Sequence, residues 1–296
     1  MLDVKRLRLL VELSRRGTIA AVAQALSYSP SAVSQQLGVL EREAGVALLE
    51  PSGRRVRLTP EGEVLVAHAE TVLAELERAR AALAPSEGPV TGTVRVAAFQ
   101  SAVLTLVPVA LTALHREHPG LRVEVTEMEP EVSLPALVSG DHDLVLGEEY
   151  PHHPLPRLRG AEREPLFEDP LRLVVPKAWG VGSLADLADR PFAMEPRGTT
   201  SREWAAAVCR EAGFEPDVRY TSTGLQVHLR LVGEGLAAAL LPELADPDRQ
   251  DGVRTAPLAG DPVRRVFAAT RTGARGRPAL RAVVAALRAV APVRVP

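Results

Sequence analysis

The sequence contains a single cysteine and no apolar run long enough to span a membrane. Cys209 therefore cannot form an internal disulfide, which suits a reducing compartment, and we expect it to act as a small apolar residue on a helix. Segment 1–17 has basic residues among its apolar ones, so it does not form a signal peptide. These absences predict a cytoplasmic chain without a membrane partner.

Motifs for catalysis and metal binding are also missing. The sequence has no Gly-rich phosphate loop and no nucleophile elbow. His115 and His118 lie three residues apart on an expected helix, and His152 and His153 are adjacent, but neither pair has the further ligands that a zinc site needs. The sequence thus predicts no enzyme activity, no metal and no cofactor.

The formal net charge is only -2 over 296 residues. A chain that is not basic throughout attracts a polyanion such as DNA only through local clusters. One such cluster lies near the N-terminus and consists of Lys5, Arg6, Arg8, Arg15 and Arg16. A length of 296 residues with 46% hydrophobic content is enough for a small first domain and a larger second one.

Segment 18–44 has the pattern of two helices joined by a tight turn. Thr18 can cap the first helix, and Ser29 with Pro30 supplies the N-cap and first residue of the second. One stripe of the second helix is apolar, and the opposite stripe consists of Ser31, Ser34, Gln35 and Gly38. This small polar face predicts a helix that enters the DNA major groove, where Gln can pair with adenine. An ordinary surface helix is the alternative.

A basic hairpin is expected directly after these helices. Val46, Leu48, Val56 and Leu58 flank the turn-forming segment 51–53. Three arginines follow at the tip and in the second strand: Arg54, Arg55 and Arg57. We expect them to follow phosphates or enter a minor groove, which adds affinity rather than sequence choice; solvated side chains are the alternative.

A long helix is predicted to begin at Thr59 and Pro60. Its apolar residues are separated alternately by four and three positions, and they are Leu65, Ala69, Val72, Leu76, Ala79 and Leu83. Such a heptad seam favours pairing with a second copy of the chain, although packing on its own domain would give the same pattern. Pairing predicts a homodimer that binds an inverted-repeat operator.

Turn residues at 85–92 indicate a boundary, after which short β-rich runs alternate with helices. This alternation predicts an α/β domain with largely parallel sheets. We expect strands near 93–99, 122–127, 144–146, 172–175, 192–194, 218–221 and 237–240. Helices are expected near 102–118, 131–139, 201–212 and 225–234. The strands form two lobes, about 91–162 with 268–296, and about 163–267, with the chain returning to the first lobe around 266–271.

Residues 1–85 resemble the winged helix-turn-helix and linker helix of LysR-type transcriptional regulators. Ser34 and Gln35 stand where that family commonly has Ser followed by Arg, so the base contact here departs from the usual pattern. The remainder resembles the family's effector-binding domain, which has a two-lobed, periplasmic-binding-protein-like fold. The resemblance implies a winged helix-turn-helix at 1–58, a dimerising linker at 59–85 and an effector-binding domain at 91–296.

The same resemblance implies a small-molecule effector between the lobes, and dimers that in many relatives pair into tetramers. A cytoplasmic small-molecule-binding module, or a degenerate enzyme, with an accessory helix-turn-helix is the alternative. The sequence leaves the effector, the target genes and the choice between activator and repressor open.

Ligands of open α/β folds lie beyond the carboxyl ends of strands, where helix N-termini offer free amides. This rule selects Gln100, Ser101, Glu129, Glu148, Thr199, Thr200, Thr221 and Thr223. The resemblance supports Ser101, Glu129 and Thr200 most directly; helix caps or turn residues are the alternative. Hydroxyl groups and helix N-termini favour the binding of an anion, whereas glutamate carboxylates favour the binding of an amine. A small zwitterion or an amine-bearing metabolite fits this pattern.

Overall fold

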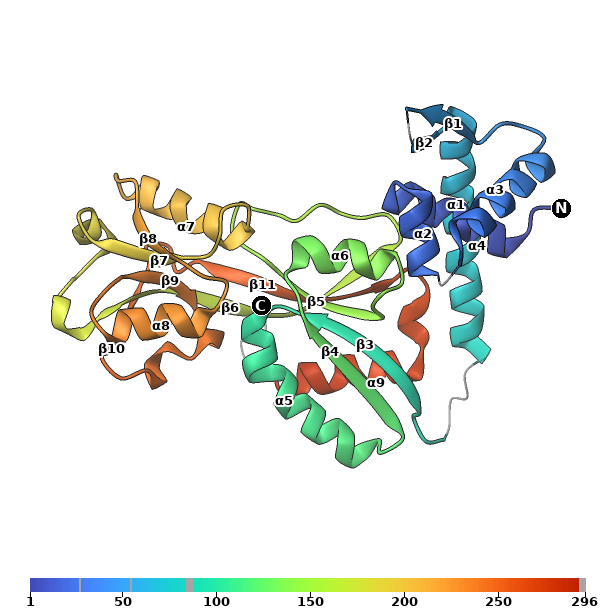
Figure 1. The fold of residues 1–296 in the computed structure, drawn as a ribbon. Coiled ribbons are helices and arrows are strands. Elements are labelled where there is room, and N and C mark those ends of the chain that lie inside the picture. The colour runs from blue at the N-terminus through green and yellow to red at the C-terminus, as the bar shows by residue number, and fades with distance from the viewer. Residues whose placement is uncertain (27, 54, 84–87, 293–296) are drawn as a thin grey trace.

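The computed structural model describes residues 1–26, 28–53, 55–83 and 88–292. Three parts follow one another along the molecule: an N-terminal helical domain with the linker helix, a middle lobe (about 91–162 and 268–292) and a distal lobe (about 163–267) (Figure 1). The expected winged helix-turn-helix with a linker helix and the two-lobed α/β domain are both present. No helix of the described residues has the length and apolar character needed to cross a membrane.

The N-terminal domain forms through local capping and one apolar core. Side chains of Asp3, Thr18 and Ser29 accept backbone N–H groups at the starts of three helices. The core buries Leu10 and Leu37 completely or nearly so. The elements are α1 (Val4–Arg16), α2 (Ile19–Ala25), α3 (Pro30–Ala44), β1 (Leu49–Ser52) and β2 (Arg55–Leu58).

The two halves of the linker helix α4 (Pro60–Leu83) differ in burial. Its first half packs into the core of the N-terminal domain, where Ala69 has no exposed surface and Leu65 is partly buried. The prediction that Ala69 belongs to a pairing seam is therefore wrong, because its side chain is already covered by its own chain. In the second half the seam residues are exposed: Val72, Leu76, Ala79 and Leu83.

One mixed sheet of seven strands runs through both lobes in the order β10-β6-β11-β5-β3-β4, with β9 also pairing with β6. Only β3 pairs in parallel, with β4 and β5; the other pairs in this sheet are antiparallel. The bounds are β3 (Gly92–Ala98), β4 (Leu121–Glu127), β5 (Leu144–Glu149), β6 (Ala161–Pro176), β9 (Ala239–Pro242), β10 (Val253–Pro257) and β11 (Val263–Arg271).

The expectation of largely parallel sheets is therefore wrong for the main sheet. The long strand β6 carries the chain into the distal lobe and β11 brings it back, so the two must run in opposite directions. A separate parallel pair, β7 (Pro191–Met194) with β8 (Asp217–Thr221), lies in the distal lobe. The sequence patterns did not predict β10 or residues 161–171 of β6.

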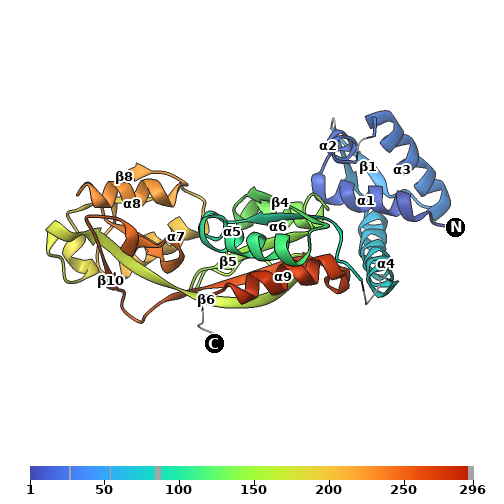
Figure 2. The same cartoon turned by 90° about the horizontal axis from the view of Figure 1, so that it is seen from below.

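Helices cover both faces of the sheet. In the middle lobe, α5 (Gln100–Glu117) and α9 (Pro278–Ala289) pack together on one face, and α6 (Pro130–Val138) lies on the other (Figures 1 and 2). The distal lobe contains α7 (Thr200–Glu211) and α8 (Leu225–Gly233). Four of these helices lie within two residues of their predicted starts and ends, whereas α9 was not predicted.

Candidate nucleic-acid interface and effector site

The polar face of α3 is presented outward. Val33, Leu37 and Leu40 are buried on the opposite side of the helix. The helix starts at Pro30, and the Ser29 Oγ accepts the N–H of Ala32 at 3.1 Å. Ser31, Ser34 and Gln35 are exposed, and the half-buried Gly38 adds no side chain between them. The result is a shallow ridge of hydroxyl and amide groups, with the size and chemistry to enter a major groove.

The hairpin after α3 has the register expected of a wing. Leu49 pairs with Leu58 and Ser52 with Arg55, and Gly53 takes a φ of 62° at the turn. Arg57 is exposed and forms an ion pair with Glu50 at 2.7 Å. Arg54 lies outside the described residues, and for Arg55 only the backbone is placed, so their predicted phosphate contacts stay predictions.

The last basic residues of α1 do not serve the DNA-facing surface. The Arg15 guanidinium donates to the carbonyl of Val138, at the end of α6, and pairs with Glu70 at 3.0 Å. Arg16 pairs with Glu12 at 2.8 Å and with Asp141 at 2.9 Å, just beyond α6. The expectation that Arg15 and Arg16 attract DNA is wrong, because their charges are taken up where the N-terminal domain meets the middle lobe.

Between the two lobes, a buried arginine joins four elements. Arg264 of β11 is 1% exposed, and its guanidinium bonds twice to the carboxylate of Asp169 on β6, at 2.7 and 2.9 Å. It also donates to the Ser101 hydroxyl at 2.7 Å and to the Glu148 carboxylate. Its guanidinium carbon lies 4.9 Å from the ring centroid of Phe99, at the start of α5.

Two hydrogen-bonded bridges connect the lobes beside Arg264. The carboxylate of Glu131, in the first turn of α6, accepts the backbone N–H of Thr200 at 3.0 Å and also its hydroxyl. The side-chain oxygen of Gln100 accepts the N–H of Leu225 at the start of α8. Each bridge thus ties a helix N-terminus of the distal lobe to a side chain of the middle lobe.

Most of the predicted effector residues lie near these contacts. Ser101 and Glu148 touch Arg264, Gln100 and Thr200 form the bridges, and Thr199 caps α7. Glu148 lies inside β5 rather than after it, so its expected position in a loop is wrong. Thr221 and Thr223 are exposed, and neither side chain hydrogen-bonds within the described residues.

Four residues of the site were not predicted from the sequence: Glu131, Asp169, Glu195 and Arg264. A signal for Arg264 exists, because it occupies an inward position of an alternating strand whose neighbouring inward position is the buried Val266. We use the name inter-lobe cluster for Ser101, Glu129, Glu131, Glu148, Asp169, Glu195 and Arg264.

Carboxylates outnumber cations in the inter-lobe cluster. Burial, reinforced by the charges of Glu148 and Glu195, raises the pKa of Glu129 to about 8. Burial also raises the pKa of Glu148 to about 7, although Arg264 opposes the shift, and it raises the pKa of Glu195. The Glu129 carboxylate has no hydrogen-bond partner among the described residues. The inter-lobe cluster therefore carries more negative than positive charge around Glu129 and Glu195.

Cys209 lies in α7 with no exposed surface. Burial raises the pKa of its thiol to about 12. This environment disfavours the reactive thiolate, so the residue packs as a small apolar side chain, as expected.

Both parts of the chain match sequence models of known protein families. A sequence model described as "Bacterial regulatory helix-turn-helix protein, lysR family" matches residues 4–63, and one described as "LysR substrate binding domain" matches residues 87–292. A probable hydrogen peroxide-inducible genes activator of Streptomyces viridosporus is 32% identical over 277 residues, covering 90% of this chain and 87% of that protein. The names of the helix-turn-helix model and of the Streptomyces relative describe regulators.

Solved structures agree in fold. A full-length cysteine-substituted OxyR from Pseudomonas aeruginosa has a TM-score of 0.71 at 24% identity, covering 100% of this chain and 99% of that one. Full-length CbnR complexed with its target DNA has a TM-score of 0.54 at 25% identity, covering 98% of this chain and 100% of that one.

Glu129→Gln tests the charge balance of the inter-lobe cluster. Because the folded-state pKa of about 8 lies above the ordinary 4.5, the folded chain keeps a proton that the unfolded chain releases. The free energy of unfolding should therefore fall as the pH rises from about 5 to 8, and the variant should lack this loss. At about pH 9 we expect the variant to be more stable by about 4–5 kcal/mol, with little difference near pH 5.

Chemical denaturation at several pH values measures this difference. Glu61→Gln, on the exposed start of α4, is the matched control and should follow the native chain. Parallel pH profiles for the native chain and Glu129→Gln would contradict the assignment.

Proposed function

Because the chain belongs to the LysR family of bacterial transcriptional regulators, we propose that it is a cytoplasmic, sequence-specific DNA-binding regulator whose effector binds at the inter-lobe cluster. The proposal rests on two features that occur in one chain: an outward polar ridge on α3, and a polar site whose side chains bridge the two lobes. The alternative of a solute-binding module or degenerate enzyme with an accessory helix-turn-helix is not favoured, because both parts match one regulator family.

Ser31, Ser34, Gln35 and Gly38 face the bases in this proposal, while Ser29 and Pro30 set the start of the reading helix. Gln35 can form two hydrogen bonds with adenine, and Ser34 can reach a base or a phosphate. The wing arginines Arg54 and Arg55 add phosphate contacts. Two copies then read the halves of an inverted repeat.

The exposed second half of α4 is the proposed dimer contact. Val72 and Leu76 are 42% and 40% exposed, and Leu83 is 84% exposed, which leaves an apolar stripe that a second α4 can cover. Ala79 lies between them and allows close approach. Leu65 contributes only at the edge of the seam, because it already packs on its own domain. Pairing of dimers into tetramers is compatible with this arrangement.

Separate apolar cores support the boundary between the proposed effector-binding domain at 91–296 and the two preceding parts, which we propose at 1–58 and 59–85. One core lies in the N-terminal domain and includes the first half of α4. The middle lobe is built around Leu144 and Leu146, and the distal lobe around Leu171 and Phe192. The lobe boundaries, about 162–163 and 267–268, fall within the crossing strands β6 and β11.

The peroxide response in the name of the Streptomyces relative does not extend to this chain in our proposal. A disulfide switch within one chain needs two cysteines, and the sequence has one. Oxidation of a single thiol needs an accessible thiolate, whereas Cys209 is buried with a pKa of about 12. Control by a bound metabolite therefore fits this chain better than control by thiol oxidation.

The chemistry of the inter-lobe cluster supports a small zwitterion as the effector. Glu129 and Glu195 are the natural partners of an ammonium group, because Arg264 is occupied by Glu148 and Asp169. The N-terminus of α7 binds a carboxylate already, that of Glu131. An effector carboxylate can take the place of Glu131 there, so binding would release the bridge between α6 and Thr200.

The helix α6 offers a direct route from the effector to the DNA-binding domain. Its first turn carries Glu131, and the carbonyls of Val138 and Ser139 at its other end accept hydrogen bonds from Arg15 and Arg16 of α1. A shift of α6 on effector binding therefore reaches α1 without passing through the linker. For this shift to control DNA binding, the effector must bind the shifted and unshifted arrangements of α6 with different affinity.

Gln35→Ala tests the reading helix. We expect it to reduce discrimination at one base pair of each half-site by about 1–3 kcal/mol, with little loss of non-specific binding. Mobility-shift titrations with the chain's own upstream DNA and base-substituted versions give the measurement. Gln36→Ala is the control, because Gln36 lies one position on and bonds to Arg6 at 2.9 Å. Equal behaviour of the two variants would remove Gln35 from the interface.

A ligand panel tests the effector class. Thermal shift of the full chain is measured with L-amino acids, with their amides and with the matching acids that lack the amine. We expect a rise in melting temperature only when both charged groups are present, and loss of that rise in Glu129→Gln. The zwitterion would be excluded if an acid without an amine raised the melting temperature equally and Glu129→Gln abolished that rise.

A double-mutant cycle tests the route through α6. Thr200→Val removes the hydroxyl that bonds to Glu131, and we expect it to change the Kd for operator DNA about threefold or more. Thr200→Ser should behave as the native chain. In a background carrying Arg15→Gln and Arg16→Gln, Thr200→Val should have no further effect. The same change in both backgrounds would mean that α6 does not connect the sites.

A further inference from the structure

Four arginines converge where the N-terminal domain meets the middle lobe. Three of them pair with one carboxylate, that of Asp143: Arg95 at 3.3 Å, Arg271 at 3.2 Å and Arg277 at 3.3 Å. The fourth is Arg8, which reaches the same place from α1. We use the name basic cluster for Arg8, Arg95, Arg271 and Arg277.

Asp143 does not balance the charge of the basic cluster. Its carboxylate is 4% exposed and accepts the backbone N–H of Arg95 at 3.0 Å in addition to the three ion pairs. Burial acts to raise the pKa of Asp143, but the Arg95 N–H and the charge of Arg271 lower this pKa overall. One negative charge therefore faces several positive ones, and the excess attracts an anion.

Two neighbouring carboxylates leave this excess unchanged. Glu124 is the cross-strand partner of Arg95, but it pairs with Arg122 at 2.8 Å. Asp141 pairs with Arg16 at 2.9 Å. Each is thus matched by an arginine that lies outside the basic cluster.

The space in front of Gly140 is bordered by three guanidinium groups. Nη2 of Arg8 and Nη1 of Arg271 lie 3.7 and 4.0 Å from the point that a Cβ of Gly140 would occupy, and Arg95 donates to the carbonyl of Gly140 at 3.1 Å. Arg8 is exposed and forms no ion pair or hydrogen bond through its side chain with any described residue. Gly140, with a φ of 83°, has no side chain to fill the space.

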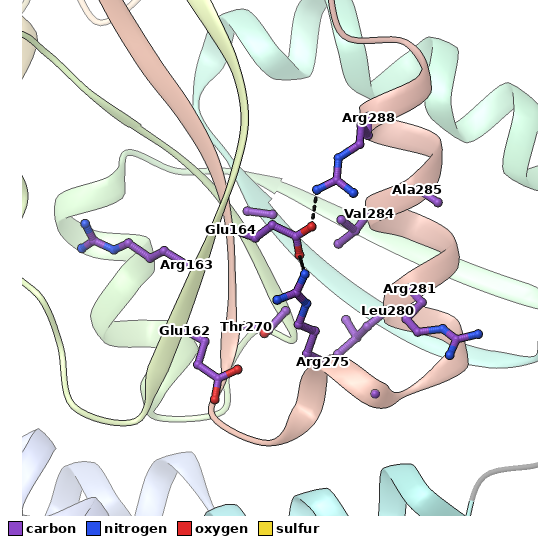
Figure 3. Close-up of a pocket in the computed structure, with 12 residues that line it drawn as sticks. Glu162, Arg163, Glu164, Thr270, Arg275, Leu280, Arg281, Val284, Ala285 and Arg288 are labelled. Atoms are coloured by element: carbon purple, nitrogen blue, oxygen red, sulfur yellow. Dashed lines mark hydrogen bonds and ion pairs between the residues drawn. The ribbon is translucent and has the colours of Figure 1, made fainter. Parts of the chain in front are cut away.

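The arginines between the sheet and α9 differ, because their charge is already used. There the carboxylate of Glu164 lies between Arg275, at 2.8 Å, and Arg288, while the guanidinium of Arg281 points away (Figure 3). The basic cluster instead combines an unpaired guanidinium, that of Arg8, with three that share one carboxylate.

We propose that the basic cluster binds a small phosphate-bearing molecule, whose phosphate lies over Gly140 and bridges Arg8 with Arg95 and Arg271. A phosphate brings up to two negative charges and several acceptor oxygens, which suit guanidinium groups that approach from different directions. The polar ridge of α3 lies on the side of the N-terminal domain away from the middle lobe (Figures 1 and 2). Operator DNA on that ridge therefore leaves the basic cluster open to a small ligand.

A bound phosphate adds a link between α1 and the middle lobe. Arg15 and Arg16 of α1 already bond to the carbonyl of Val138 and to Asp141. A phosphate held by Arg8 strengthens this contact and so fixes the N-terminal domain against the middle lobe. Its effect on operator binding rests on the proposed function, whereas phosphate binding itself does not.

Calorimetric titration of the full chain with inorganic phosphate and with glycerol 3-phosphate, at constant ionic strength in chloride, tests the site. We expect binding with a Kd in the millimolar range or tighter. The tighter of the two ligands shows whether the free ion or a phosphate ester is preferred. Arg8→Gln should weaken binding about tenfold, the effect of losing one charge-assisted hydrogen bond, without a change in melting temperature in the absence of phosphate.

Arg116→Gln is the matched control, because Arg116 is an exposed arginine of the same lobe at the far end of α5. It should leave the Kd for phosphate unchanged. The proposal is overturned if Arg8→Gln binds phosphate as tightly as the native chain, if Arg116→Gln weakens binding equally, or if neither phosphate binds at millimolar concentration. These titrations contain no DNA and no effector, so their outcome is independent of the proposed function.

Discussion

The buried guanidinium of Arg264 is the contact on which the effector domain depends. It lies where β6 and β11 pass between the lobes, and it joins Asp169, Glu148 and Ser101 from three different elements. A buried charge is tolerated only when its partners satisfy it, and loss of one partner typically costs about 3–5 kcal/mol. The geometry between the lobes is therefore fixed by electrostatics as well as by the continuous sheet.

Around this fixed point, the weaker contacts are the ones that an effector can change. The Glu131–Thr200 and Gln100–Leu225 bridges join the lobes through single side chains at exposed or half-buried positions. Such contacts cost little to break compared with the Arg264 network. The fold thus combines a strongly bonded crossing with weaker bridges beside it, and α6 extends from one of these bridges to the DNA-binding domain.

The chain shares its scaffold with a relative named for a peroxide response, and we propose that it responds to a different signal. It matches a peroxide-inducible activator over 90% of its length, yet it has one cysteine, buried in a helix. The polar groups between its lobes instead have the chemistry of a reversible ligand site. Family membership therefore defines what this protein does to DNA, while the residues of the site define what it responds to.

Local sequence patterns were enough to predict α3, because caps and helical periodicity act over a few residues: Ser29 and Pro30 set its start, and the buried and polar stripes set its orientation. Contacts between residues far apart in the chain became visible only in the folded structure. The pairing of Arg264 with Glu148, the burial of Ala69 and the attachment of Arg15 to α6 depend on which distant segments meet. Local patterns contain no information on such contacts, because they depend on how segments far apart in the sequence pack together.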